Sequence, residues 1–104
     1  MKSSVKMKIP EETESQITAS IRAYLGLRGI WHWKVWQGPM SQPKGVSDIL
    51  GCYQGKLLAI EVKRPGKNPT PDQQRFLDRV KIEGGISFVA HSVEDVMENL
   101  KRFK

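Results

Sequence analysis

The chain has 104 residues, 38% of them hydrophobic and 27% charged, which is the ordinary composition of one globular domain. It contains no apolar run of the roughly 20 residues that a membrane-spanning helix needs, and its Lys-rich beginning lacks the apolar stretch of a secretory signal. The net charge of +6 suits a polyanionic partner, either nucleic acid or an acidic membrane surface, although many small basic domains bind neither.

Residues 1–9 carry three Lys and two Ser and are expected to form a flexible leader. The following segment predicts a helix from about Pro10 to Leu27. Proline and the acidic Glu11 and Glu12 suit a first helical turn. Apolar side chains recur at helical spacing on one stripe, formed by Ile17, Ile21, Tyr24 and Leu25.

The segment 30–37 is rich in β-branched and aromatic residues and predicts a strand. The segment 38–44 contains two Pro and one Gly and predicts a loop. A hairpin is expected over 45–63, with its turn at Gln54-Gly55. Both faces of this hairpin carry apolar residues, which indicates central strands that are covered on both sides.

A second Pro-rich loop is expected over 64–71. Thr70 then predicts a helix start, since Pro71 follows it and Gln73 stands three positions later, as in a capping box. This helix should stop at Gly84-Gly85.

A short apolar strand is predicted over 86–90, and Ser92 should cap a last amphipathic helix. The predicted order is therefore α-β-β-β-α-β-α, an α/β fold with a central mixed sheet flanked by helices. We expect a single domain over 1–104. The lone Cys52 has no partner for an intrachain disulfide, which suggests a reducing, cytoplasmic location, in the host cell if the protein is viral.

Two carboxylates face each other in the predicted hairpin. If Tyr53 lies opposite Lys56 across the two-residue turn, then Asp48 lies opposite Glu61, with Cβ atoms roughly 4.5–5.5 Å apart. Lys63 projects from the same face, two residues beyond Glu61. The two negative charges repel each other, and a divalent metal bound between them would offset this repulsion and create a catalytic site. The alternative is a Lys63–Glu61 salt bridge at a frayed strand end, with Asp48 solvated.

Two further polar residues are candidates for this site. Glu14 continues the inward stripe of the first helix and could reach a metal through water, although a first-turn Glu also serves the helix dipole. Gln73 lies just beyond the loop that follows Lys63, although the capping box alone explains it equally well.

The ordered set of these motifs resembles a known family. Asp48, twelve intervening residues and then Glu61-Val62-Lys63 resemble the PD-(D/E)xK nuclease signature. With Glu14, the run Lys44-Gly45-Val46-Ser47-Asp48 and the run Thr70-Pro71-Asp72-Gln73-Gln74-Arg75-Phe76, about residues 11–90 resemble a stand-alone virus-type replication-repair nuclease (VRR-NUC) domain. Ser47 departs from the superfamily motif, which has Pro at this position, where it shapes the strand.

The resemblance implies a restriction-endonuclease-like core that cleaves DNA phosphodiesters with Mg²⁺ or Mn²⁺ and leaves a 5′-phosphate. By this resemblance Asp48, Glu61 and the main-chain carbonyl of Val62 would bind the metal, and Glu14 would hold a metal-bound water. Lys63 would orient or deprotonate the attacking water and stabilise the phosphorane charge. Gln73 would support the site.

Basic and aromatic residues near the site have less specific interpretations. Five cations beside the predicted loops could contact phosphates, or each could simply be a solvated charge: Lys34, Lys44, Arg64, Lys67 and Arg75. For Trp31, Trp33 and Trp36 we expect core packing rather than base stacking or a subunit interface. His32 and His91 lack metal-ligand spacing and are assigned no role.

The expected function is a structure-selective DNA endonuclease that resembles a Holliday-junction resolvase and acts as a homodimer on branched DNA. The first alternative is a flap- or end-processing nuclease. The second is a non-catalytic DNA-binding module of the same fold, which the intact set of Asp48, Glu61 and Lys63 disfavours.

Overall fold

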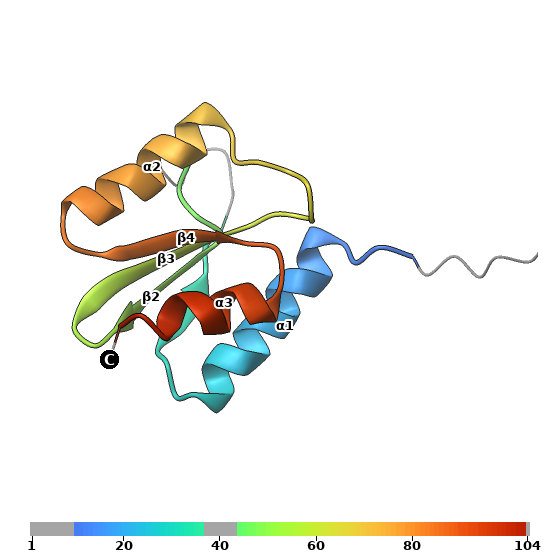
Figure 1. Cartoon of the computed structure of the whole chain (residues 1–104), viewed down its shortest axis with the longest axis horizontal. Coiled ribbons are helices and arrows are strands. Elements are labelled where there is room, and N and C mark those ends of the chain that lie inside the picture. Colours follow the sequence, from blue (N-terminus) through green and yellow to red (C-terminus); the bar gives the residue numbers. More distant parts are fainter. Residues whose placement is uncertain (1–9, 37–43, 104) are drawn as a thin grey trace, which may run out of the picture.

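The computed structural model describes residues 10–36 and 44–103 (Figure 1). The expected leader and almost all of the first Pro-rich loop lie outside the described residues. The helices and strands follow one another in the expected order: α1 (Glu14–Leu27), β1 (His32–Lys34), β2 (Ile49–Tyr53), β3 (Lys56–Val62), α2 (Pro71–Ile82), β4 (Ile86–Ala90) and α3 (Val93–Leu100). None of these helices is long and apolar enough to cross a membrane.

The four strands form one mixed sheet in the order β1-β2-β3-β4. β2 pairs antiparallel with β1 and β3, and β3 pairs parallel with β4. Helices α1 and α3 lie together on one face of the sheet and α2 covers the other (Figure 1). The fold is therefore the predicted α/β arrangement, with β3 at its centre.

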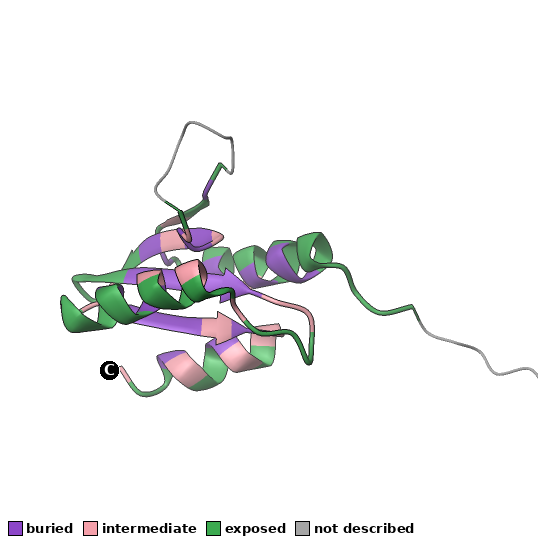
Figure 2. Cartoon of the chain, turned by 90° about the horizontal axis from the view of Figure 1, so that it is seen from above, coloured by how far each residue is buried: buried purple, intermediate pink, exposed green. Residues whose placement is uncertain are grey.

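The main core lies between the sheet and the α1/α3 layer, where side chains from both helices meet β2, β3 and β4. It includes Ile17, Ile21, Leu25, Ile49, Leu58, Ile60, Val62, Phe88, Val96 and Leu100. The opposite face is only partly covered, because α2 leaves the hairpin end open. Cys52 is exposed there and Leu57 is 44% exposed, so the expectation that both faces are covered is wrong at this end (Figure 2).

Helix α1 begins four residues later than the sequence analysis predicted. Thr13 is the N-cap, and its hydroxyl and the Gln16 side chain form a reciprocal capping box. This box satisfies the backbone N–H groups of Thr13 and Gln16 and fixes the helix start at Glu14 rather than at Pro10. Glu14 is consequently the first helical residue and is exposed, so it does not continue the buried stripe.

The prediction that the tryptophans pack in the core is wrong. Trp31, Trp33 and Trp36 are 69%, 40% and 67% exposed. Strand β1 has only three residues and lies at the edge of the sheet. The burial on this segment comes instead from Ile30 and Val35.

Candidate active site

The hairpin register places Asp48 and Glu61 at the same end of the sheet. Ile49 pairs with Ile60 and Tyr53 with Lys56, so Asp48 precedes the first β2 pair and Glu61 follows it on β3. The carboxylate of Asp48 accepts a hydrogen bond of 2.8 Å from the Val62 backbone N–H. Asp48 is therefore held against β3 rather than free in solvent, which disfavours the simple salt-bridge interpretation.

Glu61 is a buried carboxyl group that lacks sufficient partners. It is 2% exposed, and its Oε1 atom has no hydrogen-bond partner. Its Oε2 atom lies 3.8 Å from the ammonium of Lys63. Burial, the neighbouring Asp48 and the charge of Glu14 together raise the pKa of Glu61 to about 8, and the Lys63 charge only partly opposes them.

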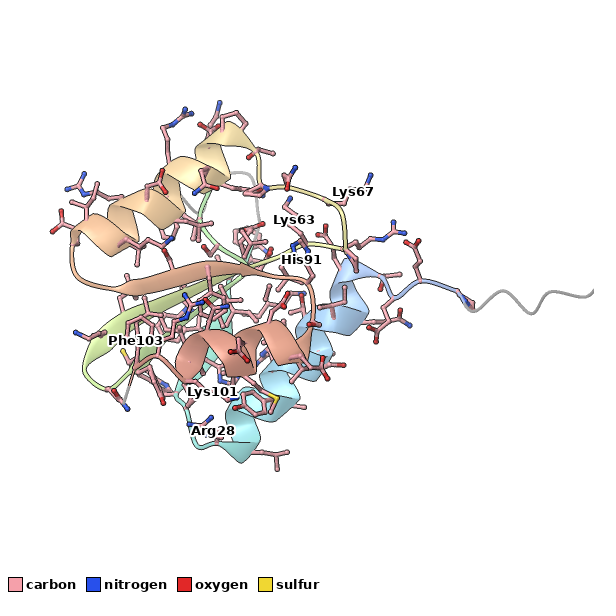
Figure 3. All side chains as sticks on the ribbon, in the orientation of Figure 1. Arg28, Lys63, Lys67, His91, Lys101 and Phe103 are labelled. Atoms are coloured by element: carbon pink, nitrogen blue, oxygen red, sulfur yellow. The ribbon has the colours of Figure 1, made fainter. Side chains whose placement is uncertain are left out.

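Lys63 is held at the carboxyl end of β3 by β4 and the residue that follows it. The backbone N–H of Lys63 donates to the Ala90 carbonyl at 3.1 Å. The Nδ1 atom of His91 lies 3.1 Å from the carbonyl oxygens of both Lys63 and Arg64. Figure 3 shows Lys63 and His91 together at this end of the sheet.

His91, which lacks metal-ligand spacing in the sequence, contacts the backbone on the carboxyl side of Lys63 and helps to fix it. The signal that could have identified it is topological. Strands β3 and β4 are parallel, so their carboxyl ends lie at one edge and the residue after β4 must approach the end of β3. The backbone N–H of His91 in turn donates to Asp95 of α3 at 2.8 Å.

Glu14 approaches the carboxylate pair without joining it. Its charge contributes to the raised pKa of Glu61, although the residue itself is exposed at the start of α1. Across residues 10–36 and 44–103, no three His, Cys, Asp or Glu side chains lie close enough together to hold a metal. Any cation here would therefore depend on Asp48, Glu61, main-chain oxygen and water.

Gln73 forms the capping box predicted for α2. Its side-chain oxygen accepts from the Thr70 backbone N–H at 2.8 Å, and its own N–H donates to the Thr70 hydroxyl at 3.2 Å. The Gln73 oxygen therefore already has a structural partner.

Gly45 connects this helix start to the segment that carries Asp48. Its φ of +85° lies in the left-handed region that favours glycine. A Cβ atom at this position would lie 2.2 Å from the carbonyl oxygen of Asp72. The Lys44-Gly45 turn therefore packs backbone against backbone on the first turn of α2, a role that the sequence analysis did not assign.

The five candidate phosphate contacts differ in their environment. Arg64 bonds Glu11 and Arg75 bonds Asp72 through their guanidinium groups. Lys34, Lys44 and Lys67 are exposed. Lys67 lies on the loop after β3, outward from Lys63 (Figure 3). Of the five candidates, only Arg64 and Lys67 lie on the loop that follows the carboxylate end of β3.

The donor set fits a hard divalent cation. Two carboxylates meet where Lys63 compensates for only part of their charge, and a buried Glu61 oxygen lacks a partner. Such oxygen ligands suit Mg²⁺ or Mn²⁺. A cation bound here would favour the ionised form of Glu61 and so lower its pKa.

Comparison with known proteins supports the fold. No family model matches the sequence, and no curated protein is significantly similar to it. A solved chain described as a VRR_NUC domain superposes with a TM-score of 0.70 at 22% sequence identity, over 88% of this chain and 97% of the other. The chain therefore has the fold of a VRR_NUC domain, as its motifs predicted.

Proposed function

We propose that this protein is a Mg²⁺- or Mn²⁺-dependent DNA endonuclease. The observation that carries the proposal is the buried Glu61 carboxyl, which has an unpartnered oxygen and faces Asp48 on a central strand. A purely structural role would not explain this arrangement, since burying a carboxyl group with one unpartnered oxygen beside a second carboxylate destabilises a fold, and the ion pair with Lys63 offsets only part of that cost. The similarity to a VRR_NUC domain chain is consistent with nuclease chemistry.

Asp48, Glu61 and the Val62 carbonyl would hold the metal, with Glu14 reaching it through water. The bound cation would polarise the scissile phosphate and make a bound water more acidic. Lys63 would orient the attacking water and stabilise negative charge on the phosphoryl oxygens. At neutral pH Glu61 would be mostly protonated without the cation, because its pKa is about 8, and a bound cation would favour its ionised form.

The proposed substrate is branched DNA, cut by a homodimer. Strand β1 forms an edge of the sheet, and Trp31 and Trp33 form an exposed aromatic pair with ring centroids 5.2 Å apart. An exposed edge strand that carries apolar rings is suited to pairing with a second copy. A two-fold dimer would present two metal centres to a junction that has the same symmetry.

The chemistry is tested with a labelled panel of four-way junction, flap, single-stranded and duplex DNA, with Mg²⁺, Mn²⁺ or EDTA. We expect metal-dependent paired nicks in the junction, and loss of cleavage in Asp48→Asn. The matched control is Asp78→Asn, which removes an exposed carboxylate of α2. Cleavage of flaps or ends alone would favour the alternative nuclease, and binding without cleavage under all conditions would overturn the proposal.

The assembly is tested by analytical ultracentrifugation at micromolar concentration, with and without junction DNA. A dimer mass is expected, and Trp31→Ser should reduce it. A strictly monomeric mass in both conditions would reject the dimer and would favour flap or end processing.

A further inference from the structure

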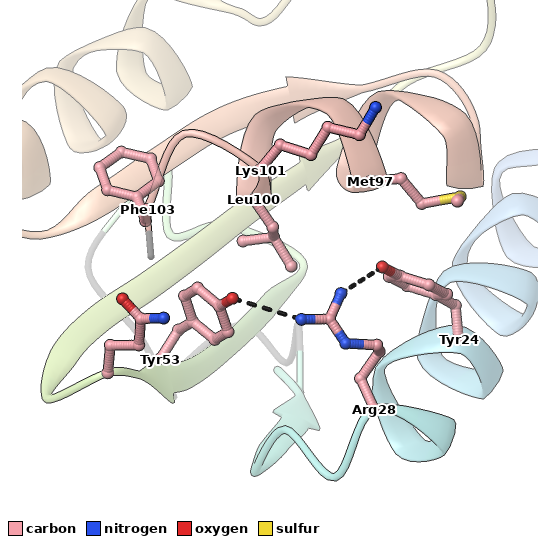
Figure 4. A pocket seen from close by; sticks show the side chains of 8 residues that line it. Tyr24, Arg28, Tyr53, Met97, Leu100, Lys101 and Phe103 are labelled. Atoms are coloured by element: carbon pink, nitrogen blue, oxygen red, sulfur yellow. Dashed lines mark hydrogen bonds between the residues drawn. The ribbon is translucent and has the colours of Figure 1, made fainter.

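A second candidate site lies at the opposite end of the sheet from the carboxylates. Strands β2 and β3 meet there in the Gln54-Gly55 turn, beside the carboxyl ends of α1 and α3. A cavity of about 510 Å³ opens between these elements, within the roughly 300–1,000 Å³ of small-ligand pockets. It is lined by Tyr24, Arg28, Tyr53, Gln54, Met97, Leu100, Lys101 and Phe103 (Figure 4).

The cavity combines aromatic surface with positive charge. The Arg28 guanidinium donates to the hydroxyls of Tyr24 at 2.5 Å and Tyr53 at 3.3 Å. It also lies 5.6 Å from the centroid of the Tyr24 ring. These contacts fix a long side chain at the mouth of the cavity. Among the described residues, the lining contains two cations and no carboxylate, so the cavity favours an anion that carries a flat apolar group.

A smaller cavity of about 200 Å³ adjoins the first and shares Phe103 with it. Two more cations, Lys81 and Arg102, line this second cavity, and none of the described residues that line it is Asp or Glu. Among the described residues, therefore, two cavities that share one phenylalanine are lined by four cations and no acid. Spaced positive charges beside aromatic rings are typical of sites that follow a single nucleic-acid strand.

We propose that this end of the sheet binds an unpaired nucleotide, with its phosphate on Arg28 and Lys101 and its base against Tyr53 and Phe103. Lys101 remains available because its contact with Glu98, at 3.8 Å, is an exposed and weak ion pair. The nucleotide could belong to a DNA strand or be free in solution. Four cations across two adjoining cavities favour the strand.

The site is distinct from the proposed catalytic site. Figure 3 shows Arg28, Lys101 and Phe103 at one end of the sheet and Lys63 and His91 at the other. The seven residues of β3 separate the two ends, about 20 Å at the usual rise per residue. A strand held at the far end would thus anchor DNA several nucleotides from the scissile bond.

Binding is measured in EDTA, where no cleavage occurs, with the full chain. Fluorescent ten-nucleotide oligothymidylate and free dAMP are titrated separately against wild type, the double variant Arg28→Gln/Lys101→Gln and the control Arg22→Gln, which removes an exposed cation of α1 outside the cavity. We expect the double variant to weaken oligonucleotide binding about tenfold, with a shallower salt dependence. The control should bind within twofold of wild type.

The oligonucleotide and free dAMP distinguish a nucleotide within a DNA strand from a nucleotide free in solution. Binding of both, each weakened by the double variant, assigns the site to a nucleotide in general. Binding of the oligonucleotide alone assigns it to a DNA strand. Equal affinity for wild type and double variant, or an equal loss in Arg22→Gln, would overturn the proposal.

A second measurement does not depend on the variants folding normally. Amide chemical shifts of ¹⁵N-labelled wild type are followed during the oligonucleotide titration in EDTA. We expect the largest changes at Gln54 and Lys101, and changes confined to the segment 61–75 would overturn the second site. The nuclease proposal fails separately, if Asp48→Asn cuts normally, so the two failures are distinguishable.

Discussion

Replacing Glu61 with Gln should make the metal-free protein more stable at neutral pH, although Glu61 is buried in the centre of the fold. The unfolded chain releases the Glu61 proton near the ordinary pKa of 4.5, whereas the folded protein keeps it until about pH 8. Between these values the folded state binds more protons, so this group makes stability fall as the pH rises. At pH 7 the cost is about 3 kcal/mol.

The raised pKa of Glu61 determines how large the stability difference should be at each pH. Urea unfolding in EDTA at pH 5, 7 and 9 measures the free energy of unfolding of Glu61→Gln and of wild type. The value for Glu61→Gln should be higher, by at most about 1 kcal/mol at pH 5 and by about 3 kcal/mol at pH 7. The advantage should reach its plateau above pH 8. The figure is an upper bound, since the new amide N–H groups also need partners.

A control variant and added Mn²⁺ provide two further checks of this prediction. Glu94→Gln, at an exposed carboxylate of α3, should keep the wild-type pH dependence above pH 5. Saturating Mn²⁺ should stabilise wild type more at pH 8 than at pH 6, because the cation competes with the Glu61 proton. Parallel stability curves for wild type and Glu61→Gln between pH 5 and 9 would refute the assignment of an ionisation cost to this group.

Three further substitutions test other parts of the site. Lys63→Ala should lose cleavage while calorimetry still detects Mn²⁺ binding; loss of metal binding in the folded variant would contradict its role. Glu14→Gln should change stability by at most about 1 kcal/mol but lower the cleavage rate by more than tenfold, and normal cleavage would leave only a helix-dipole role. Gly45→Ala should destabilise the protein by about 2 kcal/mol or more in urea unfolding, whereas Gly66→Ala, which meets no atom within 4 Å, should cost less despite the same φ of +85°.

The hairpin register was predictable because its determinants are local. The Gln54-Gly55 turn fixes which residues pair, and Gln54 does adopt a positive φ of 53°. Once Tyr53 pairs with Lys56 in an antiparallel hairpin, every other pairing follows. The two-residue period of a strand then decides which face each side chain occupies. Thr70 was likewise recognisable as a helix cap from Pro71 and Gln73.

The errors occurred where local signals compete or where distant segments meet. Thr13 and Gln16 form the same kind of capping box as Thr70 and Gln73, but the earlier Pro10 also signals a helix start. The exposure of Trp31 depends on β1 being a short edge strand, which composition does not reveal. His91 approaches Lys63 only because β4 returns parallel to β3.

The position of β3 between an antiparallel and a parallel neighbour explains how one short segment can carry the site. Its antiparallel neighbour β2 begins where β3 ends, so Asp48 arrives beside Glu61 and accepts the Val62 N–H. Its parallel neighbour β4 ends at the same edge, so His91 arrives at the Lys63 carbonyl. Contacts from both sides thus hold the backbone of Glu61-Val62-Lys63, and the hydrogen bond from Val62 to Asp48 keeps the two carboxyl groups together. A sheet with both neighbours antiparallel would bring the start of β4 to this edge, and His91 would lie at the far end.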